Sequence, residues 1–178
     1  LCIDFLKNRT DKKTVDLCSG SGAIAVALDK ISGAKVTAVE IDETAFSYLE
    51  TNVKENNSSV KPVMADALEI CETFADGELD LIVSNPPYIK SADIETLQKE
   101  VRLEPRLALD GGEDGCDFYR EIVSRWSRKL KKGGALAFEL GENQADAVKA
   151  LMTDKGFSNF KISLDFGGVQ RAIIGTLL

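Results

Sequence analysis

Apolar and polar residues follow one another along this chain in short segments that switch between strand-like and helix-like spacing. In the first half, strands are predicted at residues 14–17, 35–40, 62–65 and 79–84. A helix is predicted over residues 22–31, and a second one around Ala45, Leu49 and Val53, whose four-residue spacing marks one helical face. Strands and helices that alternate in this way indicate an α/β fold around a mainly parallel sheet.

The second half begins with an irregular segment, residues 89–115, whose length is typical of functional or disordered loops. A helical stripe follows at Phe118, Ile122, Trp126 and Leu130, and this helix is predicted to end at Gly133-Gly134. We expect Trp126 to lie in the core. The remaining predicted elements are a strand at 135–140, a helix with Ala145, Val148, Leu151 and Met152, and strands at 160–164 and 172–177.

The last two strands have only a glycine turn between them, so they are predicted to pair as an antiparallel hairpin. The whole order resembles class I methyltransferases. These have a Rossmann-like α/β fold with a seven-stranded, mostly parallel sheet and helices on both faces, and we expect one reversed strand at the end of the sheet. A length of 178 residues suits one domain, so residues 1–178 are interpreted as a single catalytic domain.

Composition narrows the class of protein further. Hydrophobic residues make up 44% and charged residues 29% of the chain, as in soluble globular proteins. No segment resembles a membrane span or a signal peptide, and we therefore expect a cytoplasmic protein. The net charge of −7 disfavours direct binding to nucleic acid and suits a basic protein partner.

Cysteine and histidine usage limits the possible chemistry. The four cysteines form no C-x-x-C pair, and the chain contains no histidine. This excludes a zinc site and a Cys–His or Ser–His catalytic pair, and we expect neither a metal nor a disulfide.

The segment Asn85-Pro86-Pro87-Tyr88 directly follows the strand at 79–84. Proline has no N–H, and Pro87 keeps the residue before it out of the helical region, so the carbonyls of Asn85 and Pro86 stay free to accept hydrogen bonds. Such acceptors suit a planar nitrogen with an aromatic ring beside it. The simpler alternative, that the segment is only a turn, is equally compatible with these four residues alone.

A second motif, Asp16 to Ala23, lies where the first strand turns into the first helix, and Gly20 and Gly22 there allow a ligand to approach the backbone. Glu40 ends the second strand and can accept both hydroxyls of a ribose. The spacing also fits an NAD site. We favour S-adenosylmethionine (SAM), because Asp16 can bind an ammonium group and Asp66, after the third strand, can accept from an adenine amino group. As structural alternatives, the three carboxylates are a helix cap, a strand end and a turn residue.

These motifs, together with Glu104-Pro105-Arg106 and Gly111-Gly112 in the irregular segment, resemble the release-factor glutamine N5-methyltransferases. The resemblance covers essentially the whole chain. It implies methyl transfer from SAM, leaving S-adenosylhomocysteine, to the glutamine amide nitrogen in the Gly-Gly-Gln loop of a class I peptide chain release factor. It also implies that members carry a helical substrate-binding domain in front of the catalytic one, which we expect this chain to lack.

The predicted site combines the residues named above with those carried over by resemblance. Cofactor-binding residues are predicted to be Asp16, Cys18, Ser19, Gly20, Ser21, Gly22, Glu40, Ile41, Asp66, Ala67 and Asn85. Substrate-binding residues are predicted to be Asn85, Pro86, Pro87 and Tyr88, of which Asn85, Pro86 and Tyr88 are the catalytic ones. Tyr88 is expected to pack on the flat amide.

One position departs from the pattern of the family. Cys18 replaces the glycine usual in the family, so its side chain must point away from the methionine moiety or reshape that pocket. Glu100, Arg102 and Glu104 are interpreted as ion pairs that fix the irregular segment, and secondarily as release-factor contacts. The alternatives are glutamine methylation of a ribosomal protein, adenine-N6 methylation of nucleic acid, and a SAM-binding module without activity. We expect a monomer.

Overall fold

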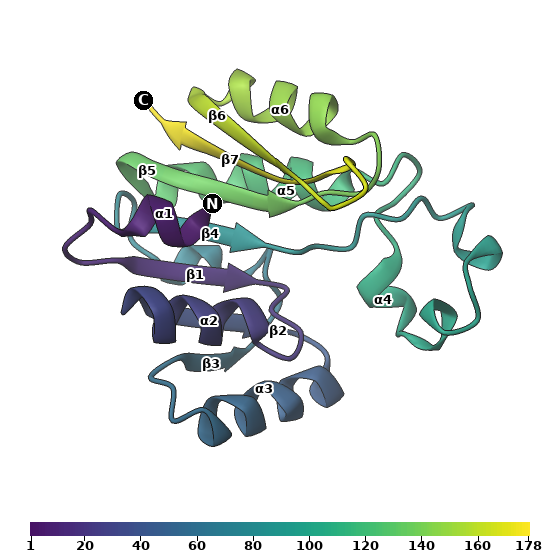
Figure 1. Ribbon diagram of the computed structural model, residues 1–178, viewed down its shortest axis with the longest axis horizontal. Coiled ribbons are helices and arrows are strands. Elements are labelled where there is room, and N and C mark those ends of the chain that lie inside the picture. The colour runs from purple at the N-terminus through teal and green to yellow at the C-terminus, as the bar shows by residue number, and fades with distance from the viewer.

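Seven strands form one sheet in the computed structural model, which describes residues 1–178. The strands are β1 (Lys13–Leu17), β2 (Lys35–Glu40), β3 (Lys61–Met64), β4 (Leu79–Ser84), β5 (Leu130–Glu139), β6 (Phe157–Leu164) and β7 (Gln170–Leu177). Their order across the sheet is β3-β2-β1-β4-β5-β7-β6 (Figure 1). The first five run parallel, and β7 runs antiparallel to both β5 and β6. The predicted fold class and hairpin are confirmed, but the reversed strand lies one place in from the edge.

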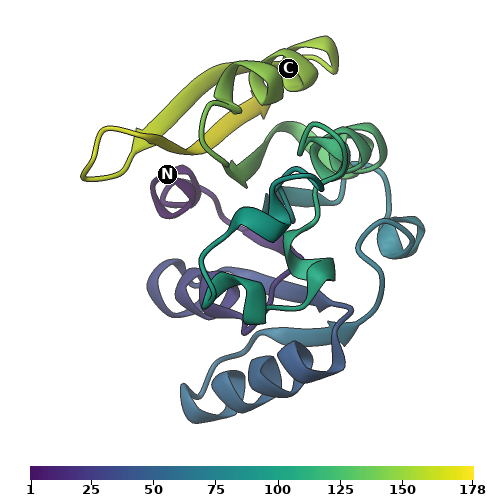
Figure 2. The same cartoon turned by 90° about the vertical axis from the view of Figure 1, so that its right-hand side faces the viewer.

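Helices cover both faces of the sheet. The chain forms the α-helices α1 (Cys2–Leu6), α2 (Ala23–Ser32), α3 (Glu43–Glu55), α4 (Arg106–Leu109), α5 (Asp117–Trp126) and α6 (Ala145–Asp154), and the short 3-10 helices η1 (Ile70–Thr73), η2 (Ile94–Thr96), η3 (Val101–Leu103) and η4 (Ser127–Lys129). The first three α-helices pack on one face, and α5 and α6 pack with η1 on the other (Figure 2). No helix has the length and apolar character needed to cross a membrane.

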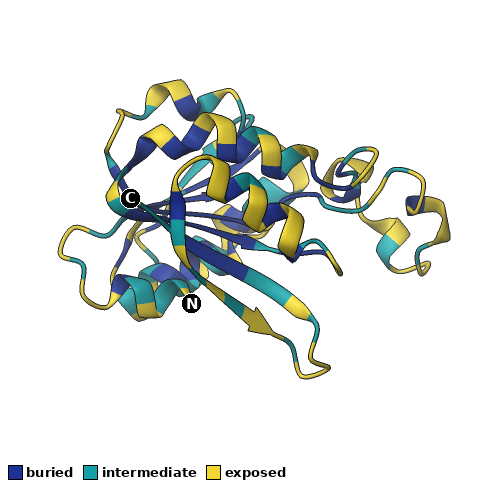
Figure 3. Ribbon diagram, turned by 90° about the horizontal axis from the view of Figure 1, so that it is seen from above, coloured by how far each residue is buried: buried dark blue, intermediate teal, exposed yellow.

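The central strands are apolar on both faces because each face is covered by helices. In β5, Leu136 and Phe138 join the core under α5 and α6, whereas Ala135 and Ala137 join the core under α1 and α2. Figure 3 shows these strands as the most buried part of the molecule. Trp126 is fully buried and its Nε1 donates to the Ala67 carbonyl at 2.9 Å, which confirms the prediction that it is a core residue.

The predicted end of the helix at Gly133-Gly134 is wrong. The helix α5 ends at Trp126, and Leu130 already starts β5 by pairing with Leu79. The next pair is Leu81 with Ala135, so Lys131–Gly134 form an irregularity inside the strand. Leu130 continues the helical spacing only by coincidence, and its side chain is buried as a strand residue. An ion pair between Lys131 Nζ and a carboxylate oxygen of the buried Asp80, at 2.8 Å, stabilises this irregular segment.

Residues 89–115 project from the carboxyl edge of the sheet as a lobe that contains η2, η3 and α4 (Figure 1). The base of the lobe is closed by backbone hydrogen bonds from Ile89 N to Leu109 O (2.9 Å) and from Gly111 N to Ile89 O (2.8 Å). Within the lobe, Arg106 pairs with Asp110 at 3.1 Å.

The expected ion pairs of Glu100, Arg102 and Glu104 do not form, so that prediction was wrong. All three side chains are exposed on and around η3, where water solvates their charges. Fixing a long exposed side chain in an ion pair there would gain little free energy.

Candidate active site

The loop between β1 and α2 turns back through three residues in the left-handed region, Cys18 (φ 55°), Gly20 (φ 55°) and Gly22 (φ 79°). Gly22 lies directly before α2, and a Cβ on it would come within 2.3 Å of the Leu49 side chain. This position therefore needs glycine for both its backbone angle and its close packing. The loop presents the first turn of α2, with its unpaired N–H groups, at the carboxyl edge of the sheet.

Glu40 ties this loop to the end of β2. Its Oε2 accepts the Gly20 N–H at 2.7 Å, and its Oε1 accepts the N–H groups of Ile41 (2.9 Å) and Asp42 (2.8 Å). Each carboxylate oxygen has two lone pairs, so Oε2 keeps one acceptor position. Glu40 thus has a structural role that the sequence did not reveal, and it still has room to accept a ligand hydroxyl.

Asp16 and Ser19 contain the buried polar atoms without partners near the loop. Neither carboxylate oxygen of Asp16 nor the hydroxyl of Ser19 has a hydrogen-bond partner of normal geometry, although the Ala25 backbone N–H is close enough to the Asp16 carboxylate to favour its charged form. Burial, reinforced by the charge of Glu40, raises the pKa of Asp16 to about 8. Buried polar groups without partners are rare in folded proteins. Their donor and acceptor chemistry fits a ligand that carries an ammonium group and further polar atoms.

Asp66 and Ala67 follow β3 at the same edge. One carboxylate oxygen of Asp66 accepts the Leu68 N–H at 2.7 Å, and its other oxygen makes no hydrogen bond. The side chain is therefore held by its own turn and keeps an oxygen available. The interpretation of Asp66 as a turn residue and its interpretation as a ligand acceptor are compatible.

A cavity of about 670 Å³ brings most of the predicted cofactor residues together. From that set it is lined by Cys18, Ser19, Gly20, Ser21, Glu40, Ile41, Asp66, Ala67 and Asn85. Its size is within the range of cavities that hold small organic ligands. Asp16 and Gly22 do not line it, so a ligand's ammonium group would reach the buried Asp16 only after a local adjustment of the loop.

Sequence reasoning missed the residues that form the outer wall of this cavity. Tyr48 from α3 and Phe118 from α5 contribute, as do Leu103 and Leu107 from the projecting lobe. Leu103 is 86% exposed and Leu107 is 52% exposed, so the lobe presents apolar side chains beside the opening. The spacing of these residues in the sequence carries no signal, because only the fold brings α3, α5 and the lobe to one edge.

The Asn85–Tyr88 segment lies at the carboxyl end of β4, next to this cavity. Asn85 is exposed and Pro86 and Pro87 are buried, and both Asn85 and Pro87 line the cavity. The carbonyls of Asn85 and Pro86 accept no hydrogen bond, and neither does the Asn85 side chain. Asn85 therefore has free acceptors in the cavity wall, whereas the free Pro86 carbonyl belongs to a residue that does not line the cavity.

Tyr88 lies differently from the expected stacking position. It is half-buried, does not line the cavity, and its hydroxyl lies 3.4 Å from a carboxylate oxygen of Glu139. Burial and the charge of Glu139 raise the pKa of Tyr88. Pro86 does not line the cavity either, so the residues of the motif in the cavity wall are the exposed Asn85 and the buried Pro87.

Burial suppresses the reactivity of the thiol beside the cavity. Burial raises the pKa of Cys18 to about 12, so this side chain is a neutral thiol at physiological pH. Cys18 lines the cavity. Its backbone is in the left-handed region, which is less favourable in free energy for a residue with a Cβ than for glycine.

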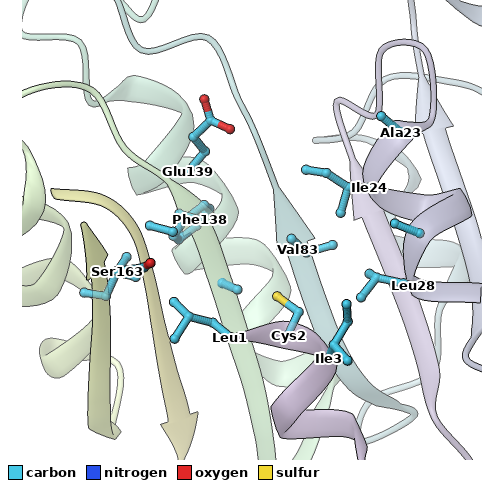
Figure 4. A pocket seen from close by; sticks show the side chains of 14 residues that line it. Leu1, Cys2, Ile3, Ala23, Ile24, Leu28, Val83, Phe138, Glu139 and Ser163 are labelled. Atoms are coloured by element: carbon cyan, nitrogen blue, oxygen red, sulfur yellow. The ribbon is translucent and has the colours of Figure 1, made fainter. Parts of the chain in front are cut away.

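A second cavity of about 450 Å³ lies between α1, α2 and the strands β4, β5 and β7 (Figure 4). Twelve of its 14 lining residues are hydrophobic, among them Ile3, Leu28 and Val83. Glu139 stands at its rim. This cavity offers too few polar partners for a charged, hydroxyl-bearing cofactor.

Comparison with known proteins identifies the family. The model of the methyltransferase small domain matches residues 1–106 of the 178. The chain belongs to the methyltransferase small domain family. Release factor glutamine methyltransferases are similar to this chain over most of its length, which confirms the resemblance that the motifs indicate.

Two such relatives and one solved structure illustrate the similarity. The release factor glutamine methyltransferase of Geobacter sulfurreducens is 42% identical over 92% of this chain and 57% of its own length, and that of Clostridium acetobutylicum is 35% identical over 97% and 61%. The chain thus spans less than two thirds of these relatives. A methyltransferase from Pyrococcus furiosus has the same fold, with a TM-score of 0.72 and 24% identity over 97% of this chain and 79% of that one.

Proposed function

We propose that this member of the methyltransferase small domain family transfers a methyl group from SAM to the side-chain amide nitrogen of the Gly-Gly-Gln glutamine of a peptide chain release factor. The observation that carries the proposal is that Asn85, with its free acceptors, lines the same cavity as Gly20, Glu40 and Asp66. The names of the similar proteins support the choice of substrate. We also propose that the chain acts as a single catalytic domain.

In this proposal, different residues in and behind the cavity wall bind different parts of the cofactor. Ser19 in the wall and, after a local adjustment of the loop, Asp16 behind it would bind the ammonium end, since buried polar atoms of both are without partners of normal geometry. Glu40 would accept a ribose hydroxyl, and Asp66 would accept from the adenine amino group. When bound, SAM supplies an electrophilic methyl group on a sulfonium sulfur.

The acceptor side of the proposal rests on Asn85 and Pro86. An amide nitrogen is a weak nucleophile because its lone pair is shared with the carbonyl. If the Asn85 side-chain oxygen and the Pro86 carbonyl each accept one amide hydrogen, the nitrogen is held with a fixed orientation toward the cavity. Such positioning contributes at best about 7 to 11 kcal/mol to lowering a barrier.

The proton balance needs no dedicated base. The amide nitrogen forms a bond to the methyl carbon as the carbon–sulfur bond breaks, which leaves S-adenosylhomocysteine. The nitrogen is then cationic and acidic, and it releases one hydrogen as a proton to solvent. Tyr88, whose hydroxyl lies near Glu139, would support the motif from behind.

One labelling experiment tests the proposed function. The chain is incubated with methyl-labelled SAM and, separately, a class I release factor, ribosomal proteins and an adenine-containing duplex, and the label is located by mass spectrometry. We expect label on the release-factor glutamine. A full-length Geobacter sulfurreducens relative serves as the positive control. Label on the duplex or on a ribosomal glutamine alone would contradict the proposal, and the acidic net charge of −7 disfavours the duplex.

A further inference from the structure

Gln144 joins several segments at the carboxyl edge of the sheet through one side chain. It is the residue immediately before α6. Its Nε2 donates to the carbonyls of Tyr88 (2.9 Å) and Gly115 (3.1 Å). Its Oε1 accepts the Gly141 N–H at 2.9 Å, and the Tyr119 hydroxyl lies 3.3 Å away. Both donors and both acceptor positions of the amide are therefore in use.

The two carbonyls that Gln144 binds are the two ends of the projecting lobe. Tyr88 is the last residue of the acceptor motif, Asn85–Tyr88, and directly precedes the lobe of residues 89–115. Gly115 is the last residue of that lobe. A single side chain thus holds the start and the end of the lobe against the turn that follows β5. The lobe in turn carries Leu103 and Leu107, which line the cavity.

The packing around the Gln144 side chain leaves almost no free space. A Cβ on Gly115 would come within 2.5 Å of the Tyr88 carbonyl oxygen and 2.6 Å of Gln144 Nε2. A Cβ on Gly141 would come within 2.5 Å of Gln144 Oε1. Because the chain approaches so closely at both glycines, small shifts of the Gln144 amide are transmitted to Tyr88.

The acceptor motif needs such an external support. Pro86 and Pro87 have no N–H, so a backbone ladder cannot fix the carbonyls of Asn85 and Pro86. The carbonyl that Gln144 holds is that of Tyr88, two residues beyond Pro86, so the support reaches the acceptors through Pro87.

We propose that Gln144 is a positioning residue for methyl transfer. Through Tyr88 it fixes the free acceptors of Asn85 and Pro86 against the cavity, and through Gly115 it fixes the lobe that forms the outer wall. This inference rests on the proposed function and adds a residue that contacts neither cofactor nor substrate.

The test replaces Gln144 by Glu, which keeps the size of the side chain but turns two hydrogen bonds to carbonyls into repulsions. We expect kcat toward a release factor to fall about 10- to 100-fold, the range that small displacements of reacting groups produce. The dissociation constant of SAM should change by less than about threefold. Amide hydrogen exchange, measured without substrate, should become faster at Ile89 and Gly111, whose N–H groups close the base of the lobe.

Two further variants keep the test decisive. Gln144→Leu removes the hydrogen bonds without adding charge and should act in the same direction. Gln170→Glu makes the same change at an exposed glutamine of β7 whose side chain makes no hydrogen bond, and should leave kcat and exchange unchanged.

The two readouts separate this inference from the proposed function. Unchanged exchange in Gln144→Glu overturns the role of Gln144, whether or not the wild-type chain methylates a release factor. Faster exchange with an unchanged kcat overturns it as well. A wild-type chain that transfers no methyl group contradicts the proposed function alone, and the exchange result still decides whether Gln144 holds the motif.

Discussion

Glu40 Oε2 accepts a hydrogen bond from the backbone N–H of Gly20 at 2.7 Å, which joins the end of β2 to the glycine loop after β1. The same carboxylate lines the cavity, so one side chain both shapes the loop and faces the ligand. Loop geometry and ligand affinity are therefore expected to depend on Glu40 together.

Replacing Glu40 by Gln should weaken SAM binding. The new amide group turns one acceptor into a donor opposite backbone N–H groups, so the loop must move. Losing a charged hydrogen bond costs about 1.5–3 kcal/mol, which corresponds to a roughly 10- to 100-fold higher dissociation constant by titration calorimetry. Glu43→Gln, at an exposed position of α3, is the matched control. Equal affinities in both variants would contradict the role of Glu40.

Asp16 should make stability fall as the pH rises. The pKa of Asp16 is raised from 3.8 to about 8 by burial, so between these values the folded protein holds a proton that the unfolded chain has lost. The free energy of unfolding therefore decreases from about pH 4 to about pH 8 on account of this group. Asp16→Asn should remove this decrease in urea unfolding curves, and Asp154→Asn, at an exposed position, should retain it. Identical pH profiles in the two variants would rule out this assignment.

Ligand binding should release a proton from Asp16. An ammonium group placed next to the carboxyl stabilises its charged form and lowers its pKa. At about pH 6.5 a free α-amino group is already protonated, so net release of about one proton per SAM comes from the protein. Calorimetry in buffers of different ionisation enthalpy measures this number. Asp16→Asn should reduce it to zero, and a release that persists in this variant would show that another group is responsible.

Cys18→Gly should stabilise the protein. Cys18 has a φ of 55°, which costs a residue with a side chain about 1–2 kcal/mol. Part of this gain is offset by the greater freedom of glycine in the unfolded chain, so we expect a net gain of about 1 kcal/mol and a melting temperature about 2–4 °C higher. Cys18→Val, β-branched at the same angle, should destabilise. Thermal unfolding that ranks Gly below Cys would disprove the strain.

The regular part of the fold was predictable because its periodicity is unambiguous. Lys35–Glu40 contains Val36, Ala38 and Val39, ends in a carboxylate and forms β2 with the predicted bounds. Leu130 shows the limit of the same reasoning. It falls on the four-residue stripe of α5, and only its pairing with Leu79 reveals that the strand has already begun.

The part of the candidate site that was predictable consists of the residues that follow the ends of strands. Residues at the carboxyl ends of β1, β2, β3 and β4 meet in one cavity because parallel strands end at one edge. The positions of individual side chains could not be predicted in this way. Tyr88 contacts Glu139, and Asp16 does not line the cavity. Gln144 was missed because its partners at Tyr88 and Gly115 are distant in sequence, although its place just after β5 marked the same edge.

The most direct test of the central claim is the turnover of Asn85→Ala with a release factor at saturating SAM, measured beside the dissociation constant of SAM. If Asn85 positions the substrate amide, turnover falls about 100-fold or more while the dissociation constant changes by less than about threefold. Asn8→Ala, at an exposed asparagine whose side chain makes no hydrogen bond, should match wild type. Turnover of Asn85→Ala comparable to wild type would contradict the account.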